Sequence, residues 1–478
     1  MSLRQRNTNQ KNKNKNKNKN KNKNKNKNTN TNTNKNKNKN KNKNKNKNTK
    51  QNQKQQSVQE PKKSNLKDKL QRKNGHKPEF RKSLLDETTN SNLSNGTINL
   101  LVFILCILCC DKMITNYYQN QPIVDWSFLG YLLKGEEWAI LWSAIMMLWT
   151  FPLFFIEKLL SKKKIPAWIG HIYYTFFTAS LFSVPTFFVF YQKYRPIPGA
   201  SVSMQMAVFS MKMHSFYFTN RKFRNKQLDQ DKKLEYPKHI TLKHFVYFLF
   251  SPTLVYEPRY PMDQKRNWLK IIKYFILMWI SFFVAYMDIN YLIVPILRQT
   301  LTFNFFRALL KLAAPAIFCW FALFFGVFHC FLNFIAEILR FGDRKFYSDW
   351  WNAKNFQEWW SKWNYPVHEW FFRSIYIRLM NDFHIPKIGA MLIVFLITAV
   401  WHELVVSMSF GLVRPWLAGM IILQLLIILF TSFPIFSESR LGNVFIWFCL
   451  SVGQPIVWSA YAWSYYSKYP YKMEFNHS

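Results

Sequence analysis

A histidine beside a glutamate inside an apolar stretch is the strongest chemical signal in the sequence. His402 and Glu403 follow fourteen residues without a charge and precede another apolar run. Ionisable side chains are expensive to keep at membrane depth, so such a pair usually marks a functional site. Adjacent helical residues point about 100° apart, and we therefore expect one side chain to do chemistry while the other supports it. A hydrogen bond between helices is the alternative role of the pair.

Side-chain amides at membrane depth form a second group of candidates. Asn364 and His368 lie in a tryptophan-rich segment, and Gln454 lies in the middle of the last apolar stretch. Amide N–H groups can donate to a developing oxyanion, but amides also commonly connect helices, so both roles stay open. Three further histidines stand alone at membrane depth, and we expect structural roles for them: His171, His214 and His329.

Common catalytic and metal-binding patterns are absent from the sequence. It contains no Gly-x-Ser-x-Gly elbow, no phosphate-binding loop, no His-Glu-x-x-His motif and no His-x4-Asp acyltransferase motif. Cys106 and Cys109 have the spacing of a metal or redox pair, but they lie in an apolar stretch without a second pair of ligands. We expect packing or palmitoylation there, and no metal site.

Composition divides the chain into two parts. Residues 1–82 contain 29 Lys and Arg, three acidic residues and only six apolar residues, and much of this stretch is a Lys-Asn repeat. Residues 83–478 contain all 19 tryptophans and are roughly 58% apolar, which exceeds the usual share in soluble domains. The body is therefore a poor match to a soluble protein or to a basic nucleic-acid-binding domain.

The tail at residues 1–82 is predicted to be disordered, because it cannot bury enough apolar surface to offset its chain entropy. It could be a polybasic arm for anionic lipid or RNA, or a low-complexity expansion without dedicated chemistry. No aromatic residues alternate with the lysines of the repeat, so bases would find no stacking platform, and no nucleic-acid partner is expected. A segment with this many positive charges resists translocation across a membrane, which places the N-terminus in the cytosol.

Nine apolar stretches in the body predict an all-α polytopic membrane protein. A helix needs about 20 residues to span a bilayer, and most of these stretches reach that length. With a cytosolic N-terminus, nine spans place the C-terminus in the lumen. The stretches are 98–110, 138–156, 165–191, 202–218, 268–287, 312–336, 388–413, 417–436 and 444–466.

A short motif between two of these stretches gives the body a resemblance to a known family. Its order, Phe-Tyr-Ser-Asp-Trp-Trp-Asn, resembles the FYxDWWN signature of sterol and diacylglycerol acyltransferases, which belong to the membrane-bound O-acyltransferase superfamily. His402, followed by Glu403, resembles the catalytic histidine of that superfamily. The signature residues are Phe346, Tyr347, Asp349, Trp350, Trp351 and Asn352.

Three small differences make the chain more similar to the diacylglycerol branch than to the sterol branch. Pro366 precedes Val-His, Gly342 stands where sterol enzymes usually show alanine, and Gln454 stands where they show asparagine. Two residues depart from the family pattern. Glu369 replaces a more typical lysine, and Met391 stands where the family can present an arginine toward the CoA.

The resemblance implies a mechanism in which His402 is the general base that takes the proton of the acceptor hydroxyl. Asn364 and Gln454 would donate to the thioester carbonyl, and Glu403 would orient the histidine's helix or the acceptor. Five residues map onto family positions around the acyl-CoA path: Trp360, Trp363, His368, Tyr376 and Tyr466. Acyl-CoA is a co-substrate, and no bound cofactor or metal is implied, because thioester cleavage supplies the driving force.

The same resemblance implies acyl-CoA and diacylglycerol as substrates, with membrane lipid around the protein. It further implies a homo-oligomer, either a dimer or a tetramer, in the endoplasmic reticulum membrane, with residues 83–478 as one membrane-embedded acyltransferase domain. Two alternatives stay open. The acceptor can be a sterol or a long-chain alcohol, or the chain can be a non-enzymatic lipid carrier or channel. A channel would carry charged residues along several helices, and the near-absence of such charges favours the enzyme.

Overall fold

The computed structural model describes residues 78–87, 107, 109–225, 236–299 and 305–468. Helices form the regular structure of these residues, and among them no β-strand occurs, only two isolated β-bridges. The predicted all-α class is confirmed. Of the predicted tail, residues 78–82 are described, and the rest lies outside the described residues.

Six helical stretches are long and apolar enough to cross a membrane, and each contains or overlaps one of the nine predicted stretches. They are Ser127–Ser161, Ala167–Tyr191, Trp268–Gln299, Phe306–Leu339, Lys387–Phe410 and Arg440–Lys468. Their sequences are apolar over 18 residues or more. In a bilayer every backbone polar group must be satisfied within the segment, and a continuous helix does this.

The predicted count of nine is not confirmed. The stretch at 202–218 forms the long helix α9 (Pro196–Arg224), but one lysine in its middle and three basic residues in its last turn make it less apolar than the other six. The stretch at 417–436 forms α19 (Trp416–Thr431), whose 16 residues span about 24 Å, less than the roughly 30 Å of a bilayer core. The stretch at 98–110 lies largely outside the described residues.

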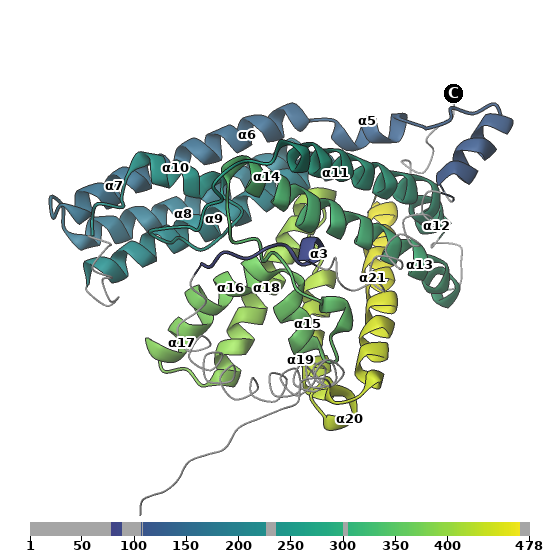
Figure 1. Ribbon diagram of the computed structural model, residues 1–478. Helices are drawn as coiled ribbons and strands as arrows, with labels where there is room; N and C mark the ends of the chain where they lie inside the picture. The colour runs from purple at the N-terminus through teal and green to yellow at the C-terminus, as the bar shows by residue number, and fades with distance from the viewer. Residues whose placement is uncertain (1–77, 88–106, 108, 226–235, 300–304, 469–478) are drawn as a thin grey trace, which may run out of the picture. The chain divides into compact units, whose positions relative to one another are not determined.

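The helix that carries His402 contacts helices from several parts of the chain, as can be followed in Figure 1. This helix, α18 (Lys387–Phe410), packs along α9 and α19 and also contacts α8 (Ala167–Tyr191). α21 (Arg440–Lys468) packs against α13 (Phe305–Phe324) and α19. α18 is therefore well placed to bring its side chains to an interior site.

Short helices precede α18 and carry the tryptophan-rich segment. α15 (Phe356–Trp363) begins at Asn355, and α16 (Tyr365–Phe371) begins at Asn364. In both cases the asparagine side chain accepts a hydrogen bond from the backbone N–H three residues later, which makes each of them an N-cap. The second cap therefore divides the segment into two helices, after which the chain turns into a π-helical segment, η5 (Phe372–Tyr376).

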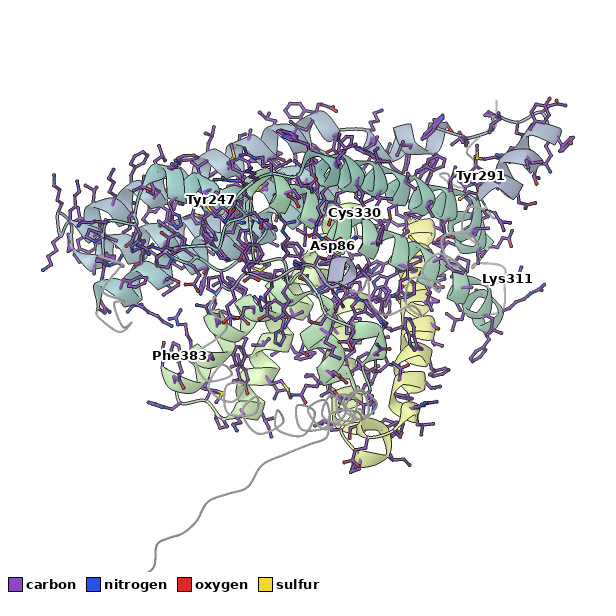
Figure 2. The ribbon with its side chains drawn as sticks, viewed as in Figure 1. Asp86, Tyr247, Tyr291, Lys311, Cys330 and Phe383 are labelled. Carbon is purple, nitrogen blue, oxygen red and sulfur yellow. The ribbon has the colours of Figure 1, made fainter. Side chains whose placement is uncertain are left out.

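Residues 78–87 attach the chain that follows the tail to the body. Arg81 forms a β-bridge with Asp343, and its guanidinium makes two hydrogen bonds with the Asp343 carboxylate at 2.6 and 2.7 Å. Asp86, which Figure 2 shows among the helices, accepts a hydrogen bond from the Tyr274 hydroxyl. These contacts fix the last residues before the helical body at two separate points.

Candidate active site

The position of the His402 imidazole on α18 is fixed by one hydrogen bond. Its Nδ1 lies 2.8 Å from the backbone carbonyl oxygen of Thr398. A carbonyl oxygen can only accept, so Nδ1 carries the proton and donates it. In the neutral imidazole the other nitrogen, Nε2, then holds the free lone pair. No hydrogen-bond partner for Nε2 occurs among the described residues, which leaves this nitrogen available as a base.

The His402 side chain is among the exposed side chains of α18. The helices that pack against α18 therefore do not cover the imidazole, and a substrate can reach its Nε2.

The face of α18 that carries His402 is turned toward α15. Met391, Phe395 and His402 share this face, because they are spaced by four and seven residues. The Phe395 ring lies against the Trp360 ring of α15, with 5.8 Å between their centroids. Trp360 Nε1 in turn donates to Gln424 Oε1 at 2.9 Å. Gln424 was not among the residues predicted from the sequence, although an amide within a 16-residue apolar helix is a recognisable signal of a functional residue.

Glu403 points away from that face and connects three helices. Its Oε1 accepts from the Tyr461 hydroxyl of α21 at 2.6 Å and from Ser407 Oγ at 3.2 Å. Its Oε2 accepts from Ala418 N–H of α19 at 3.1 Å. The first N–H groups of a helix have no partner within it, so Glu403 satisfies one of them. Both carboxylate oxygens are engaged by the protein, and Tyr461 is a second residue that sequence reasoning missed.

Asn364 combines a structural bond with a free donor. Its Oδ1 accepts from Val367 N–H at 3.3 Å and so caps α16. An amide also carries two N–H donors on nitrogen. In the described parts of the chain these two donors have no hydrogen-bond partner, and the residue is only partly buried. The cap therefore orients the amide while its donors stay available.

His368 lies one turn after Asn364 and begins a short row of rings. Its imidazole stacks on Phe372 with 6.3 Å between centroids, and Phe372 stacks on Tyr376 at 5.8 Å. Burial lowers the pKa of the His368 imidazole, against an opposing effect of Glu369, so the ring is neutral at physiological pH. Its Nδ1 is buried without a hydrogen-bond partner among the described residues. Asn364, His368 and Tyr376 thus follow one face of α16 and η5.

Gln454 lies within α21 beside Pro455, a proline inside the helix. Its Oε1 is buried and has no hydrogen-bond partner in the described structure. Buried polar atoms are normally satisfied, so this amide lacks a structural role that would explain it. No hydrogen bond between described residues joins Gln454, Asn364 and His402 to one another. The three side chains are presented by three separate helices, α21, α16 and α18, and form no hydrogen bonds with one another.

The signature motif forms part of an aromatic core. Phe346, Tyr347 and Trp350 are almost completely buried. The Trp350 ring packs against Trp320 at 4.9 Å and against Trp363 at 5.2 Å. The remaining polar and aromatic members of the motif make local contacts: Asp349 pairs with Lys362 at 2.9 Å, Trp351 packs edge-on against Trp350 at 5.5 Å, and Asn352 N–H donates to Asp349 O at 3.0 Å.

Two residues that the resemblance assigns to the acyl-CoA path differ in their surroundings. Trp363 is packed against the aromatic core and stacks on Trp320 with 4.1 Å between centroids. Tyr466 lies near the end of α21, where it interacts with Arg298. It stands twelve residues beyond Gln454, which corresponds to about 18 Å along a helix. Tyr466 is therefore remote from Gln454 along the same helix.

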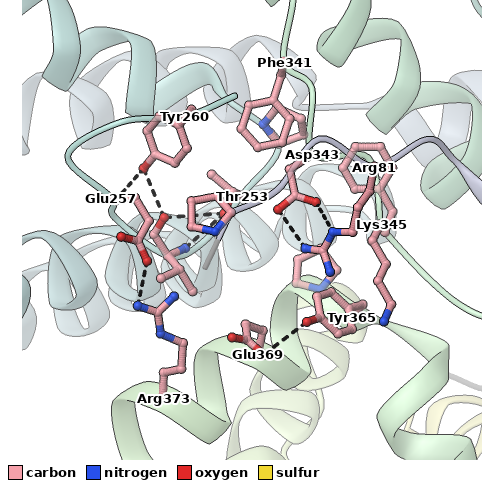
Figure 3. A pocket seen from close by; sticks show the side chains of 15 residues that line it. Arg81, Thr253, Glu257, Tyr260, Phe341, Asp343, Lys345, Tyr365, Glu369 and Arg373 are labelled. Carbon is pink, nitrogen blue, oxygen red and sulfur yellow. Dashed lines mark hydrogen bonds and ion pairs between the residues drawn. The ribbon is translucent and has the colours of Figure 1, made fainter. Parts of the chain in front are cut away.

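A separate pocket lies on a neighbouring side of α16 (Figure 3). Four parts of the chain line this pocket: residues 78–81, the chain after α10 (Leu242–Phe250), the chain around Asp343, and the start of α16 and η5. Charged groups of opposite sign are paired across it, Arg81 with Asp343 and Arg373 with Glu257, each at 2.6 Å. His402 does not line this pocket. In the described parts of the chain no group of three or more His, Cys, Asp or Glu could hold a metal ion.

Comparisons with known proteins show the family of the chain. A family model described as membrane-bound O-acyltransferase matches residues 138–463. Diacylglycerol O-acyltransferase 1B of Glycine max is 30% identical over 383 residues, which cover 76% of this chain and 75% of that protein. Diacylglycerol O-acyltransferase 1-1 of Oryza sativa subsp. japonica is 31% identical over 382 residues, covering 76% of this chain and 70% of that protein.

A further relative comes from Dictyostelium discoideum. Diacylglycerol O-acyltransferase 1 of Dictyostelium discoideum is 28% identical over 396 residues, which cover 79% of this chain and 63% of that protein. The family match includes five of the six long apolar helices in full or nearly in full and most of the remaining one. The chain is thus a multi-pass membrane protein, and it belongs to the membrane-bound O-acyltransferase family.

Proposed function

We propose that the protein transfers a fatty acyl group from acyl-CoA to the free hydroxyl of diacylglycerol, which produces triacylglycerol and CoA. The names of its relatives support the substrates. The observation that carries the chemistry is the state of His402. Its Nδ1 is held by the Thr398 carbonyl, its side chain is exposed, and its Nε2 has no hydrogen-bond partner among the described residues.

His402 is the general base in this proposal. Its Nε2 takes the proton of the diacylglycerol hydroxyl while the hydroxyl oxygen attacks the thioester carbonyl carbon. A C–O bond forms, and the carbonyl oxygen carries the negative charge of the tetrahedral intermediate. When the carbonyl reforms, the C–S bond breaks, and the proton passes from the imidazolium to the departing thiolate. The ester and free CoA then balance the reaction without a covalent enzyme intermediate.

The oxyanion is stabilised by side-chain amides in this proposal. The Asn364 amide has two N–H donors without a hydrogen-bond partner among the described residues, and the Nε2 of Gln454 carries two further N–H donors. Amide groups without structural partners are available to a developing charge, and a preorganised donor contributes a large share of the rate enhancement. We assign both amides to the thioester carbonyl. Trp360, Trp363, His368, Tyr376 and Tyr466 are assigned to the acyl-CoA path.

Glu403 acts indirectly in this proposal, as a residue that positions α18. Its three hydrogen bonds to α18, α19 and α21 use both carboxylate oxygens, so the carboxylate has little capacity left for an acceptor. The sequence left two roles open for Glu403, orienting the helix or orienting the acceptor. These contacts support the first role.

We further assign the protein to the endoplasmic reticulum membrane as a homo-oligomer, with a cytosolic N-terminus and a lumenal C-terminus. The cationic tail supports the cytosolic assignment, because such a block resists translocation. A glycosylation sequon placed in an extension beyond Ser478 tests the other end. Glycosylation of the extension is expected, and an unmodified extension contradicts a lumenal C-terminus.

The activity itself is tested with purified full-length protein, labelled oleoyl-CoA and three acceptors offered in parallel: dioleoylglycerol, cholesterol and hexadecanol. We expect labelled triacylglycerol to be the main product. Cholesteryl ester or wax ester as the main product would keep the acyl transfer and replace the acceptor. No transfer to any acceptor, from protein that is folded and binds oleoyl-CoA, would contradict the proposed function.

A further inference from the structure

Lys212 is an enclosed lysine that the proposed chemistry does not use. It lies on α9, and only 3% of the residue is exposed. Its Nζ donates to three backbone carbonyl oxygens, those of Phe248 at 2.8 Å, Ser251 at 2.8 Å and Thr253 at 2.7 Å. An ammonium has three N–H donors, so each donor has one acceptor. Among the described residues no carboxylate pairs with this ammonium.

The three carbonyls lie at the end of α10 and just beyond it. Phe248 belongs to the last turn of α10, Ser251 is its C-cap, and Thr253 lies in the chain that follows. The last carbonyl oxygens of a helix receive no hydrogen bond from an N–H group of the same helix, and the helix dipole favours a cation near that end. Lys212 thus supplies both the donors and the charge that this helix end lacks.

The chain after α10 extends this anchorage toward α16. Tyr256 N–H donates to Ser215 Oγ at 2.8 Å, and Ser215 lies one turn after Lys212 on α9. The next residue, Glu257, pairs with Arg373 at 2.6 Å (Figure 3). We call residues 251–257 the α10 loop. Lys212 therefore holds the first half of this loop, Ser215 holds Tyr256 near its other end, and Glu257 at that end pairs with Arg373.

Arg373 is the second residue of η5, directly after α16. It is attached to the helix that presents Asn364 and His368 on a neighbouring face. A second contact from α9 reaches the same helix, because Trp370 Nε1 donates to the Met211 carbonyl oxygen at 2.8 Å. α9 thus holds α16 directly through Trp370 and indirectly through the α10 loop. The indirect route depends on Lys212.

We propose that Lys212 is a positioning residue for the acyl transfer site, acting through the α10 loop and the Glu257–Arg373 ion pair on α16. The inference rests on the proposed function, in which α16 presents Asn364 to the thioester. Without the ammonium, the Thr253 carbonyl loses its one donor among the described residues, and the Phe248 and Ser251 carbonyls keep only the Ser251 hydroxyl and the Thr253 N–H. A carbonyl without a donor in the protein interior is costly. The loop must then rearrange, Glu257 moves with it, and Arg373 no longer holds α16 in register.

The test compares Lys212→Met with Lys273→Met in the full-length protein. Methionine keeps most of the length of lysine without its charge. Lys273 lies on α11 (Trp268–Asp288), is exposed and contacts the Tyr274 ring, so its variant controls for loss of a lysine from a membrane helix. We measure kcat and KM for oleoyl-CoA per folded molecule, and backbone hydrogen exchange without substrate.

For Lys212→Met we expect kcat to fall by about 10- to 100-fold, the scale of a small misplacement of a reacting group, with a smaller change in KM. Amide exchange should accelerate both in the α10 loop and in residues 364–376, and stay unchanged in α18. The Lys273→Met variant should match the wild type in both measurements. Combining Lys212→Met with Arg373→Met should cost less than the product of the two single losses, because both act on one contact route.

Two results would overturn the proposal: an unchanged kcat in folded Lys212→Met, or faster exchange confined to the α10 loop. If Lys212→Met does not fold, Ser215→Ala takes its place, since it removes only the Tyr256 contact. It should then accelerate exchange in residues 364–376 to a smaller extent, and unchanged exchange there would overturn the proposal. Exchange is measured without substrate, so a wild-type protein that fails to acylate diacylglycerol contradicts the proposed function and leaves this test valid.

Discussion

The signature motif and the His402 face of α18 differ in how their side chains are used. Trp350 is completely buried and packs against several aromatic rings, and the Tyr347 hydroxyl is 2.8 Å from His329 Nδ1. His402 is instead exposed, and its Nε2 has no hydrogen-bond partner among the described residues. The motif residues build the aromatic core, where Trp350 Nε1 is also buried without a hydrogen-bond partner in the described structure, whereas the chemistry is assigned to groups outside that core.

The same contrast divides His402 from its neighbour in the chain. Glu403 uses both carboxylate oxygens in hydrogen bonds to α18, α19 and α21. His402 uses one ring nitrogen, and for a local purpose. A group whose polar atoms are all engaged holds helices together, whereas an exposed group with an unpaired atom is free to act on a substrate.

The largest expected effect is the loss of transfer in His402→Ala. A positioned general base contributes about 10²- to 10⁴-fold to the rate, so we predict that kcat falls by that factor while the protein stays folded. His329→Ala is the matched control, because His329 is also a histidine on a membrane helix but is buried and bonded to Tyr347. It should lower stability more than turnover. His402→Ala with more than about a third of wild-type kcat would refute the assignment.

Trp350→Ala should affect the fold before the chemistry. Replacing a buried tryptophan by alanine typically lowers the free energy of unfolding by about 3–5 kcal/mol, which a denaturation curve in detergent measures. The molecules that remain folded should keep kcat within about tenfold, because truncation acts on packing and leaves the base in place. A stable Trp350→Ala protein without turnover would show that the motif takes part directly in the reaction.

Asn364→Ala and Asn355→Ala separate the cap from the donor. Both asparagines cap a helix through the same side-chain bond, and each variant should lose about 1 kcal/mol of stability. Only Asn364 is assigned to the oxyanion, and losing one such donor costs on the order of 10²-fold in kcat. Equal kcat values in the two variants would reduce Asn364 to a cap. A change confined to KM would make it a substrate-binding residue.

Tyr461→Phe should have the smallest effect. The variant removes one of three hydrogen bonds to Glu403, and a bond to a charged group contributes about 1.5–3 kcal/mol. We expect a lower unfolding midpoint and a fall in kcat of less than about tenfold, with KM unchanged. A fall as large as that of His402→Ala would move Glu403 from positioning into the reaction itself.

The sequence predicted much of this arrangement wherever the determinants are local. Apolar runs located the six long helices, and the 100° between adjacent residues predicted that His402 and Glu403 would face different ways. The predicted count of nine is not confirmed at α19, which is apolar but short, or at α9, which is long but partly charged. Window length and charge together decide a span, and the predicted stretches at these two places met only one requirement.

Partners from distant segments could not be predicted from the sequence. Tyr461 is 58 residues from Glu403, and Gln424 is 64 residues from Trp360. Lys212 is 36 to 41 residues from the three carbonyl groups to which it donates. Nothing local specifies such contacts, because they depend on which helices pack together. The tail at residues 1–77 lies outside the described residues, and its predicted disorder stays a prediction.

The claim that His402 is a base in a direct transfer is tested most directly by a rapid-quench experiment. Wild-type enzyme is mixed with labelled oleoyl-CoA, first without an acceptor and then with dioleoylglycerol. The account predicts that free CoA appears only after the acceptor is added, at the same rate as triacylglycerol, and that no label stays on the protein. A burst of free CoA equal to the enzyme concentration without acceptor, with label bound to the protein, would contradict it.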